Sequence, residues 1–432
     1  MKEDLRKKSD RRAWLIVATG FLCMFTIYAI SLNCLGLFLK PMAETFDASR
    51  ATISGITSIS MIVGIPMTLI YGVIFDKKAV KIPMAIGCFI TGAGYMVLAY
   101  APSIAICYVG AILIGIGASG AMQLPISVVL NNWFVEKKGL AMGIAFSGSG
   151  VGGVVFSQLI NYFIVAHSWR TAYLVLGLLT ILITVIPVSL FVTKTPEAVG
   201  LLPYGKKKKH SADETVSEVR AQSSSSLMAT IRTSEFWLYF LGAAAISFTM
   251  SAIKGHIPAY MTDIGYTEQV AANILSITVL TVIPGKPILG IVFDKLGSKA
   301  GTLTSIGLMI LGILLLIFTP VAFLFAIFFG ICYGVGSAYA TVGPAMVIGD
   351  VFRSSSSNYG TIFSISSTGA TLAGAIGPAI FGAIFDTTGS YTGAWILGIA
   401  GLFIGMVLVV MAVHITHKKY TKQQTLEVQY EN

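Results

Sequence analysis

Charged residues are scarce in this chain. Only 11% of its 432 residues are Asp, Glu, Lys or Arg, whereas about a quarter of an average soluble domain is charged. This composition excludes a folded surface that meets water on all sides. Apolar residues make up 55% of the chain, in runs as long as the roughly 20 residues that a helix needs to cross a membrane. The sequence therefore predicts an all-α membrane protein with many spans.

Paired cysteines and metal-binding patterns are also missing. The five cysteines are scattered through apolar runs without a CxxC pattern, which is typical of small buried residues and excludes a disulfide framework. The five histidines show no HExxH-like spacing, so we expect no metal, no cofactor and no enzymatic activity. The basic head, residues 1–12, leads directly into an apolar run, and no removable signal peptide is expected.

Twelve apolar runs divide the chain into two sets of six. They lie near residues 13–39, 52–75, 82–101, 103–130, 139–165 and 170–193, and then near 236–261, 269–293, 300–318, 321–349, 359–385 and 390–413. These runs predict an N-terminal six-helix bundle at 1–193 and a C-terminal six-helix bundle with a short tail at 236–432. The polar segment 194–235 contains four consecutive lysines and four consecutive serines, and it is predicted to be a flexible linker.

The distribution of lysine and arginine predicts the orientation. With a cytoplasmic N-terminus, 24 of the 29 basic residues fall on the cytoplasmic side and three on the opposite side. Cytoplasmic loops carry such an excess, so both termini and the linker are predicted to be cytoplasmic in a protein of the cell membrane. The net charge of +10 then reflects topology and not nucleic-acid binding. The lysine run 206–209 is either a solvated loop or a contact with anionic lipid.

The two halves of the chain repeat. The pattern IPxxxxxGxxFDK at residues 65–77 recurs at 283–295, with a constant offset of 218 residues. Gly115, Gly117 and Pro125 recur 219 residues later, as Gly334, Gly336 and Pro344. A duplicated six-span unit around a midplane cavity is typical of secondary transporters.

Two loops carry a more specific pattern. GxxxDKxAxK at residues 72–81 and GxxxDKxGxK at 290–299 resemble the loop motif of the major facilitator superfamily. This resemblance implies the major facilitator fold, with twelve transmembrane helices in two six-helix repeats. In that family the aspartate caps a neighbouring helix end, which implies gating roles for Asp76, Lys77, Asp294 and Lys295. A plain positive-inside signal is the alternative, although that rule counts only the basic residues.

A second resemblance narrows the family. Residues 132–141, NWFVEKKGLA, and the following GSGVGG at 148–153, together with Lys40-Pro41, resemble the monocarboxylate transporters and the oxalate/formate antiporters. This resemblance implies a small organic anion as the substrate. Near the first span, Asn33 aligns with a position where some relatives carry a second lysine. Span 11, which bears a lysine in the oxalate/formate antiporter, contains none here.

Two lysines lie inside predicted spans, whereas all 19 acidic residues fall in predicted loops, tails or span ends. A charge at the bilayer centre costs at least ~2.5 kcal/mol and usually marks a substrate path. Lys286 lies between Pro284 and Pro287, which are predicted to disrupt the helix; the matching position in the first repeat is Thr68. Lys286-Pro287 also resembles the Arg-Pro segment that holds the substrate carboxylate in monocarboxylate transporters. The alternative is a lysine that extends toward Asp294.

The second embedded lysine belongs to a polar stripe. Lys254 shares a helical face with Ser247 and Ser251, at spacings of three and four residues, and the stripe is predicted to line the central cavity or its outer mouth. His256 points away from Lys254 and is interpreted as a gate or packing residue, with a proton carrier as the alternative. Weaker candidates for the pathway are Tyr28, Gln123, Gln158, Tyr339 and Trp395.

Together these features predict a secondary transporter for a small organic anion, specifically a monocarboxylate. The position four residues before Lys286, acidic in many monocarboxylate transporters, is Val282. Anion exchange or movement of a proton with the substrate is therefore expected instead of a relay through a protein carboxylate. The predicted partners are the anion, membrane lipid, and protons or a counter-anion, with the chain as a monomer. An exporter of hydrophobic or cationic compounds, a membrane enzyme and a sensor that binds without transport remain alternatives.

Overall fold

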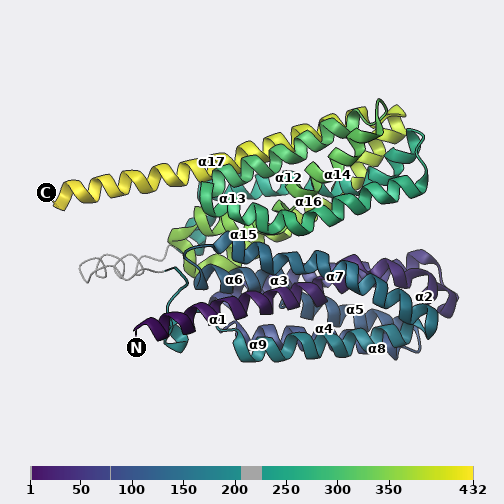
Figure 1. Ribbon diagram of the computed structural model, residues 1–432, viewed down its shortest axis with the longest axis horizontal. Helices are drawn as coiled ribbons and strands as arrows, with labels where there is room; N and C mark the ends of the chain where they lie inside the picture. Colours follow the sequence, from purple (N-terminus) through teal and green to yellow (C-terminus); the bar gives the residue numbers. More distant parts are fainter. Residues whose placement is uncertain (1, 78, 206–225, 432) are drawn as a thin grey trace. The chain divides into compact units, whose positions relative to one another are not determined.

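The computed structural model describes residues 2–77, 79–205 and 226–431. It divides into two compact units that meet in sequence between residues 207 and 208. The described residues form helices joined by short turns (Figure 1), with one isolated bridge between Phe134 and Tyr204 and no β-strand. The predicted bundles, 1–193 and 236–432, each lie within one unit. The lysine run 206–209 and serines 223–225 lie outside the described residues.

Unit 1 begins with a long segment that changes helix type. This segment comprises α1 (Lys2–Cys23), the π-helix η1 (Met24–Asn33), the 3₁₀-helix η2 (Leu35–Phe38) and α2 (Leu39–Phe46). The remaining helices are α3 (Arg50–Lys77), α4 (Lys81–Ala99), α5 (Ile104–Ser119), α6 (Gln123–Trp133), α7 (Lys138–Ala166), α8 (Trp169–Thr180), the π-helix η3 (Ile181–Val185), α9 (Ile186–Phe191) and the 3₁₀-helix η4 (Glu197–Val199). The sequence pattern did not predict either π-helix.

Unit 2 consists of fewer and longer helices. They are α11 (Leu227–Ile231), α12 (Ser234–Asp263), α13 (Glu268–Ile317), α14 (Phe323–Ser337), α15 (Tyr339–Val351), the 3₁₀-helix η5 (Arg353–Asn358), α16 (Tyr359–Thr388) and α17 (Thr392–Glu431). The short C-terminal tail predicted after residue 413 is helical, since α17 continues to Glu431 and projects past its neighbours in this unit (Figure 1). Residues 414–431 contain no glycine or proline, so nothing in their sequence ends the helix.

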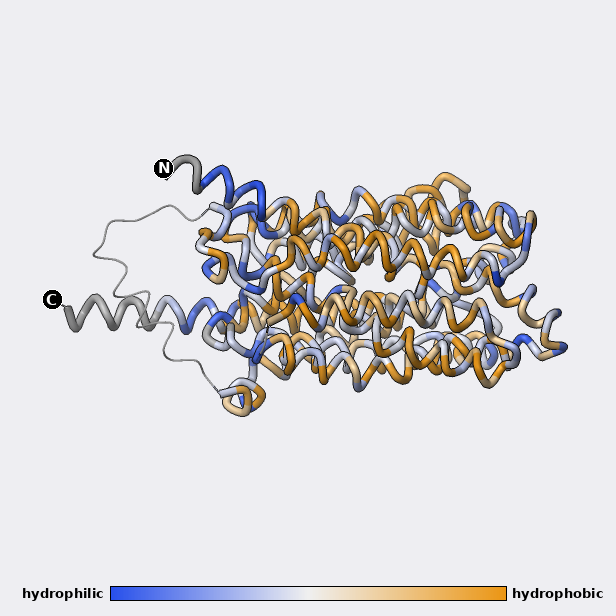
Figure 2. The backbone as a smooth tube through the Cα atoms, turned by 90° about the horizontal axis from the view of Figure 1, so that it is seen from below, coloured by the Kyte–Doolittle hydropathy of each residue, from blue (hydrophilic) through white to orange (hydrophobic). Residues whose placement is uncertain are grey.

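Eleven helical segments of the described residues are long and apolar enough to cross a membrane. In each unit apolar stretches run along the helices and hydrophilic residues gather toward the helix ends (Figure 2). One segment, α13, has 50 residues and would be about 75 Å long if straight, more than twice the ~30 Å of the hydrocarbon core. Its backbone is non-helical at Gly297, with φ 79° and ψ 176°. The predicted runs 269–293 and 300–318 lie on either side of this residue, and the count of twelve spans stays a prediction.

The predicted helix break at Pro284 and Pro287 is wrong. In α13, which is described throughout, the non-helical dihedral angles occur at Gly297 and not near these prolines. Proline fixes φ at a value that a helix accepts, although each interior proline costs one backbone hydrogen bond and a clash with the preceding turn. A contact with α14 supports the helix one turn before these prolines. The Thr281 hydroxyl donates a hydrogen bond to the Gly330 carbonyl of α14 at 3.0 Å.

Close helix contacts repeat in the two units. A Cβ atom added to Gly115 of α5 would lie 2.4 Å from the Ser60 carbonyl oxygen of α3. The equivalent pair in unit 2 is Gly334 of α14 and Thr278 of α13, where the corresponding distance is 2.5 Å. Small residues let membrane helices approach until backbones touch. The repeat seen in the sequence is therefore also a repeat of the packing register.

This contact predicts which glycines tolerate a side chain. We expect Gly334→Ala to lower the free energy of unfolding by about 1–3 kcal/mol, because the added methyl group overpacks a backbone contact. The matched control is Gly307→Ala in α13, where an added Cβ would meet no atom within 4 Å; it should be neutral or stabilising by about 0.5–1 kcal/mol. Thermal unfolding of both purified variants in detergent checks the difference. Equal melting temperatures would contradict the contact.

Candidate functional site

Lys286 lies in the membrane-spanning part of α13 and only 4% of its surface is exposed. The adjacent Gly285 fits tightly against α14, because a Cβ atom there would lie 3.0 Å from Val335 Cα. The equivalent residue of unit 1, Thr68, donates its hydroxyl to the Gly64 carbonyl of its own helix at 2.8 Å. Lysine is almost never buried to this degree without a specific role. The matching positions of the two repeats therefore differ in charge, with a neutral threonine in unit 1 and a buried lysine in unit 2.

The polar stripe on α12 divides between two environments. A Cβ atom at Gly374 of α16 would lie 3.0 Å from Ser247 Oγ and 3.6 Å from Ser251 Cβ. Ser247 and Ser251 therefore face α16 and are partly buried there. Lys254 is exposed, and within the described part of the chain it makes no hydrogen bond or ion pair. Ser247 and Ser251 thus lie together at the contact between α12 and α16, whereas Lys254 lies outside this contact.

Tyr28 and Asn33 both lie in the π-helix η1 of unit 1. The Asn33 amide donates a hydrogen bond to the Ser149 carbonyl of α7 at 3.0 Å, and part of its surface stays exposed. Next to this contact, a Cβ atom at Gly152 would overlap the Phe25 carbonyl oxygen. π-Helical turns within α-helices are frequent at functional sites. This shape was not predictable from an apolar run, and it supports a role for the first span.

His256 joins three segments of unit 2. Its Nε2 lies 2.9 Å from the Pro378 carbonyl oxygen of α16, and its Nδ1 lies 3.1 Å from the Tyr391 hydroxyl before α17. Because a carbonyl only accepts hydrogen bonds, Nε2 carries a proton, and a neutral ring accepts from Tyr391 at Nδ1. The Tyr391 ring also stacks on Trp395, with centroids 5.3 Å apart. His256 thus connects α12 to α16 and to Tyr391, and its role as a packing or gate residue stays a prediction.

The two predicted gating loops differ in their surroundings. In unit 1 the Lys194 ammonium donates a hydrogen bond to the Asp76 main-chain carbonyl at 2.6 Å. Partial burial lowers the pKa of Lys194, and the nearby Asp76 charge opposes this shift. Lys77 is exposed, as are Asp294 and Lys295 in unit 2. The first loop is thus tied to the segment that follows the sixth predicted span.

The weaker candidates fall mainly into packing positions. Tyr339 and Trp395 are 3% and 1% exposed. Gln123 is partly buried and Gln158 is exposed. Trp395 Nε1 finds no hydrogen-bond partner in the described residues, whereas the Tyr339 hydroxyl lies near Thr302. Nor do three His, Cys, Asp or Glu side chains of the described chain converge as a metal site would require.

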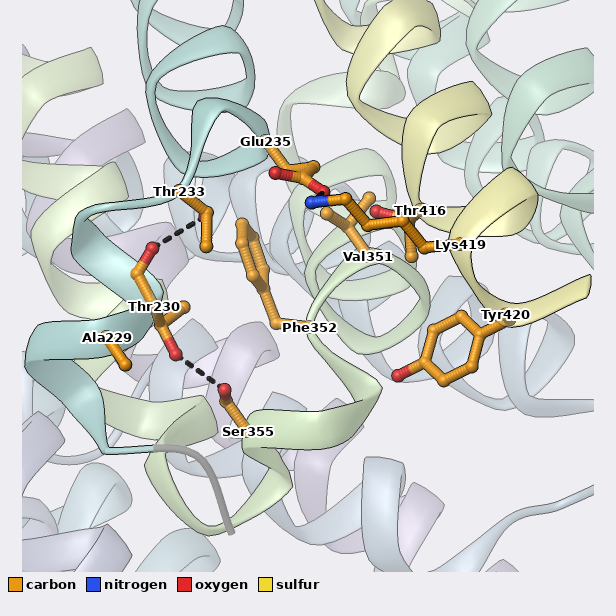
Figure 3. A pocket seen from close by; sticks show the side chains of 10 residues that line it. All are labelled: Ala229, Thr230, Thr233, Glu235, Val351, Phe352, Ser355, Thr416, Lys419 and Tyr420. Atoms are coloured by element: carbon orange, nitrogen blue, oxygen red, sulfur yellow. Dashed lines mark hydrogen bonds and ion pairs between the residues drawn. The ribbon is translucent and has the colours of Figure 1, made fainter. Parts of the chain in front are cut away.

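A pocket that the sequence did not predict lies at one end of unit 2 (Figure 3), with a volume of about 240 Å³. Its lining includes Thr230, Glu235, Ser355 and Lys419 but none of the predicted site residues. The Glu235 side chain is 7% exposed and forms an ion pair with Lys419, while the Thr230 and Ser355 hydroxyls are 2.6 Å apart. The ion pair connects the first turn of α12 to α17, across 184 positions of sequence. No local pattern indicates such a contact.

Comparison with known proteins identifies the family. The sequence matches the model of the Major Facilitator Superfamily over residues 21–352 and 239–428. An uncharacterized MFS-type transporter of Bacillus subtilis, YcxA, is 24% identical, over 96% of this chain and 98% of that protein. Human monocarboxylate transporter 12 is 25% identical, over 91% of this chain and 79% of that protein. Rat monocarboxylate transporter 13 is 22% identical, over 93% and 89% of the two chains.

A solved structure supports the same fold. The crystal structure of the Escherichia coli fucose:proton symporter, FucP, covers 92% of this chain and 99% of its own, with a TM-score of 0.66. At 15% sequence identity this likeness concerns the fold and not the substrate. With the family match over most of the sequence and its many candidate spans, the chain is a multi-pass membrane protein that belongs to the Major Facilitator Superfamily.

Proposed function

We propose that this protein is a secondary transporter that carries a small monocarboxylate across the cell membrane by alternating access. The observation that carries the proposal is the burial of Lys286 within a membrane helix, at 4% exposure. The names of relatives that align with most of the chain, monocarboxylate transporters 12 and 13, support the same class of cargo. A carboxylate is the group whose charge and size complement a single ammonium.

The energetics of this site favour an anion. Holding an ammonium group at membrane depth is costly, and an anionic substrate reduces the cost while it is bound. A transporter needs a ligand whose binding free energy differs between its conformations. The charge of Lys286 supplies such a difference if its access to water changes during the cycle. Lys254, Ser247, Ser251, Asn33 and Tyr28 complete the proposed substrate pathway.

The proposed architecture has twelve spans and cytoplasmic termini. Counting the two parts of α13 on either side of Gly297 as separate spans brings the eleven long segments to twelve. The excess of Lys and Arg in alternate loops favours cytoplasmic termini. Val282 stands four residues before Lys286, at a position that is acidic in many monocarboxylate transporters. We therefore propose anion exchange or movement of a proton with the substrate.

The first test of this function is uptake of labelled monocarboxylates and dicarboxylates into proteoliposomes. We expect Lys286→Ala to reduce monocarboxylate uptake by about 10–100-fold, because a hydrogen bond from a charged donor is worth about 1.5–3 kcal/mol. Lys286→Arg keeps the charge and should retain more uptake than the alanine variant. The matched control is Thr68→Ala at the equivalent position of unit 1, which should retain normal uptake. Unchanged uptake in Lys286→Ala would refute the site, and transport of cationic dyes alone would identify an exporter.

A second test concerns His256. We expect His256→Gln to keep the pH dependence of uptake, because this residue connects helices and does not carry the coupled proton. His256→Phe removes both hydrogen bonds and should lower the free energy of unfolding by about 1–3 kcal/mol, since it leaves a buried partner unsatisfied. Melting temperatures and uptake at two pH values measure these effects. Loss of the pH dependence in both variants, with uptake otherwise intact, would make His256 a proton carrier.

A further inference from the structure

Residues 193–205 follow the helical segment of unit 1 that ends at Phe191, and from residue 194 onward they were predicted to be part of a flexible linker. In the structure they are bound to the same unit, and we call them the docked segment. The Asn132 amide donates to the Lys194 carbonyl at 3.1 Å, and Trp133 Nε1 donates to the Thr193 carbonyl at 2.8 Å. Further along, the Leu202 amide donates to Ser9 Oγ at 3.2 Å. The first residues of the predicted linker therefore belong to the folded unit.

Tyr204 forms the far end of this attachment. Its amide donates to the Trp133 carbonyl at 2.8 Å, and its carbonyl accepts from the Val135 amide at 3.0 Å. Its ring lies among Trp14 and Phe134, with centroid distances of 6.0 and 5.3 Å. Backbone bonds and aromatic packing thus act together at this point. The docked segment therefore binds to residues of the stretch 132–137, which is part of the motif NWFVEKKGLA.

Lys194 connects the docked segment to the first gating loop. Its ammonium donates to the Asp76 carbonyl at 2.6 Å, in the last turn of α3, where backbone carbonyls lack partners within the helix. A cation at a helix C-terminus also interacts favourably with the helix dipole. Arg12 makes a similar contact nearby, with its guanidinium bound to the Leu190 and Phe191 carbonyls at the end of α9, both at 3.0 Å. Basic side chains therefore hold two helix ends of this unit in place.

The second gating loop is built differently. After Lys295 the chain turns at Gly297, whose φ of 79° is accessible mainly to glycine. The matching residue of the first loop is Ala79. Asp294 and Lys295 are exposed, whereas Lys194 is partly buried against the first loop. In the first repeat, a lysine at the start of the linker thus binds the main chain of the gating loop.

We propose that Lys194 is a positioning residue of the first gating loop, which it fixes to the docked segment so that both move as one body during transport. This inference rests on the proposed transport function. The linker that joins the two units then begins after the docked segment and not at residue 194. Lys194 acts on the gating step through Asp76 and does not contact the substrate.

The test uses the full-length protein and two independent measurements. Hydrogen exchange with mass spectrometry follows the amides of residues 193–205, and uptake into proteoliposomes gives the maximal rate and KM. We expect Lys194→Met to speed exchange in this segment and to lower the maximal rate by about tenfold, as for loss of one charged hydrogen bond, with little change in KM. Lys194→Arg should restore both values. Arg11→Gln, which removes an exposed cation of α1, is the matched control and should change neither.

A cross-link tests the movement as one body. The Leu202 main-chain amide lies 3.2 Å from Ser9 Oγ, so residues 9 and 202 are neighbours, and a disulfide formed between Ser9→Cys and Leu202→Cys fixes the docked segment to α1. We expect equal uptake before and after reduction. Uptake that returns only after reduction would overturn the proposal, because the segment would then have to detach. A normal maximal rate in Lys194→Met, or a higher KM alone, would also overturn it. If the wild type carries no monocarboxylate, the proposed function fails, whereas unchanged exchange in Lys194→Met refutes the attachment itself.

Discussion

The hydrocarbon core of a membrane offers no hydrogen-bond partners, and this constraint determines most of what this chain does. Backbone groups must be satisfied within helices, so the described chain is helical almost throughout. Association of helices then depends on close packing, since lipid tails are as apolar as the side chains. The paired contacts of Gly115 with Ser60 and of Gly334 with Thr278 show how the same solution appears in both repeats. A charged side chain buried among such helices is costly and therefore indicates a functional role.

Lys286 is such a side chain. In unit 1 the matching residue, Thr68, donates its hydroxyl to the Gly64 carbonyl of its own helix. This position of the repeat therefore also accepts a neutral residue, and a buried lysine at membrane depth is costly. The most economical explanation is a ligand of opposite charge. Asp76 and Glu235 lie near helix ends, and Asp294 lies three residues before the non-helical Gly297, so these acidic residues do not carry the same implication.

Periodicity and composition predicted the elements that depend on hydrophobic length. The two sets of spans, the offset of 218 residues and the family all follow from apolar runs and one doubled loop pattern. Features that depend on three-dimensional packing were not predictable. The π-helix η1, the unbroken helix through Pro284 and Pro287, and the serines facing Gly374 are set by neighbouring helices far away in sequence. The ion pair between Glu235 and Lys419 is likewise invisible to any local pattern.

The two repeats share the same glycine contacts between helices but differ in where they carry lysines. Unit 2 carries the embedded lysines, at Lys254 and Lys286, whereas unit 1 carries Lys194 at the helix end beside Asp76. A transporter built from identical halves would present the same site and the same gate twice. Substitution at a few positions of a duplicated frame is enough to separate these tasks, because the glycine contacts that hold the helices do not involve the charged residues. In this protein the lysines within spans therefore belong to the second repeat, and the contact between Lys194 and Asp76 belongs to the first.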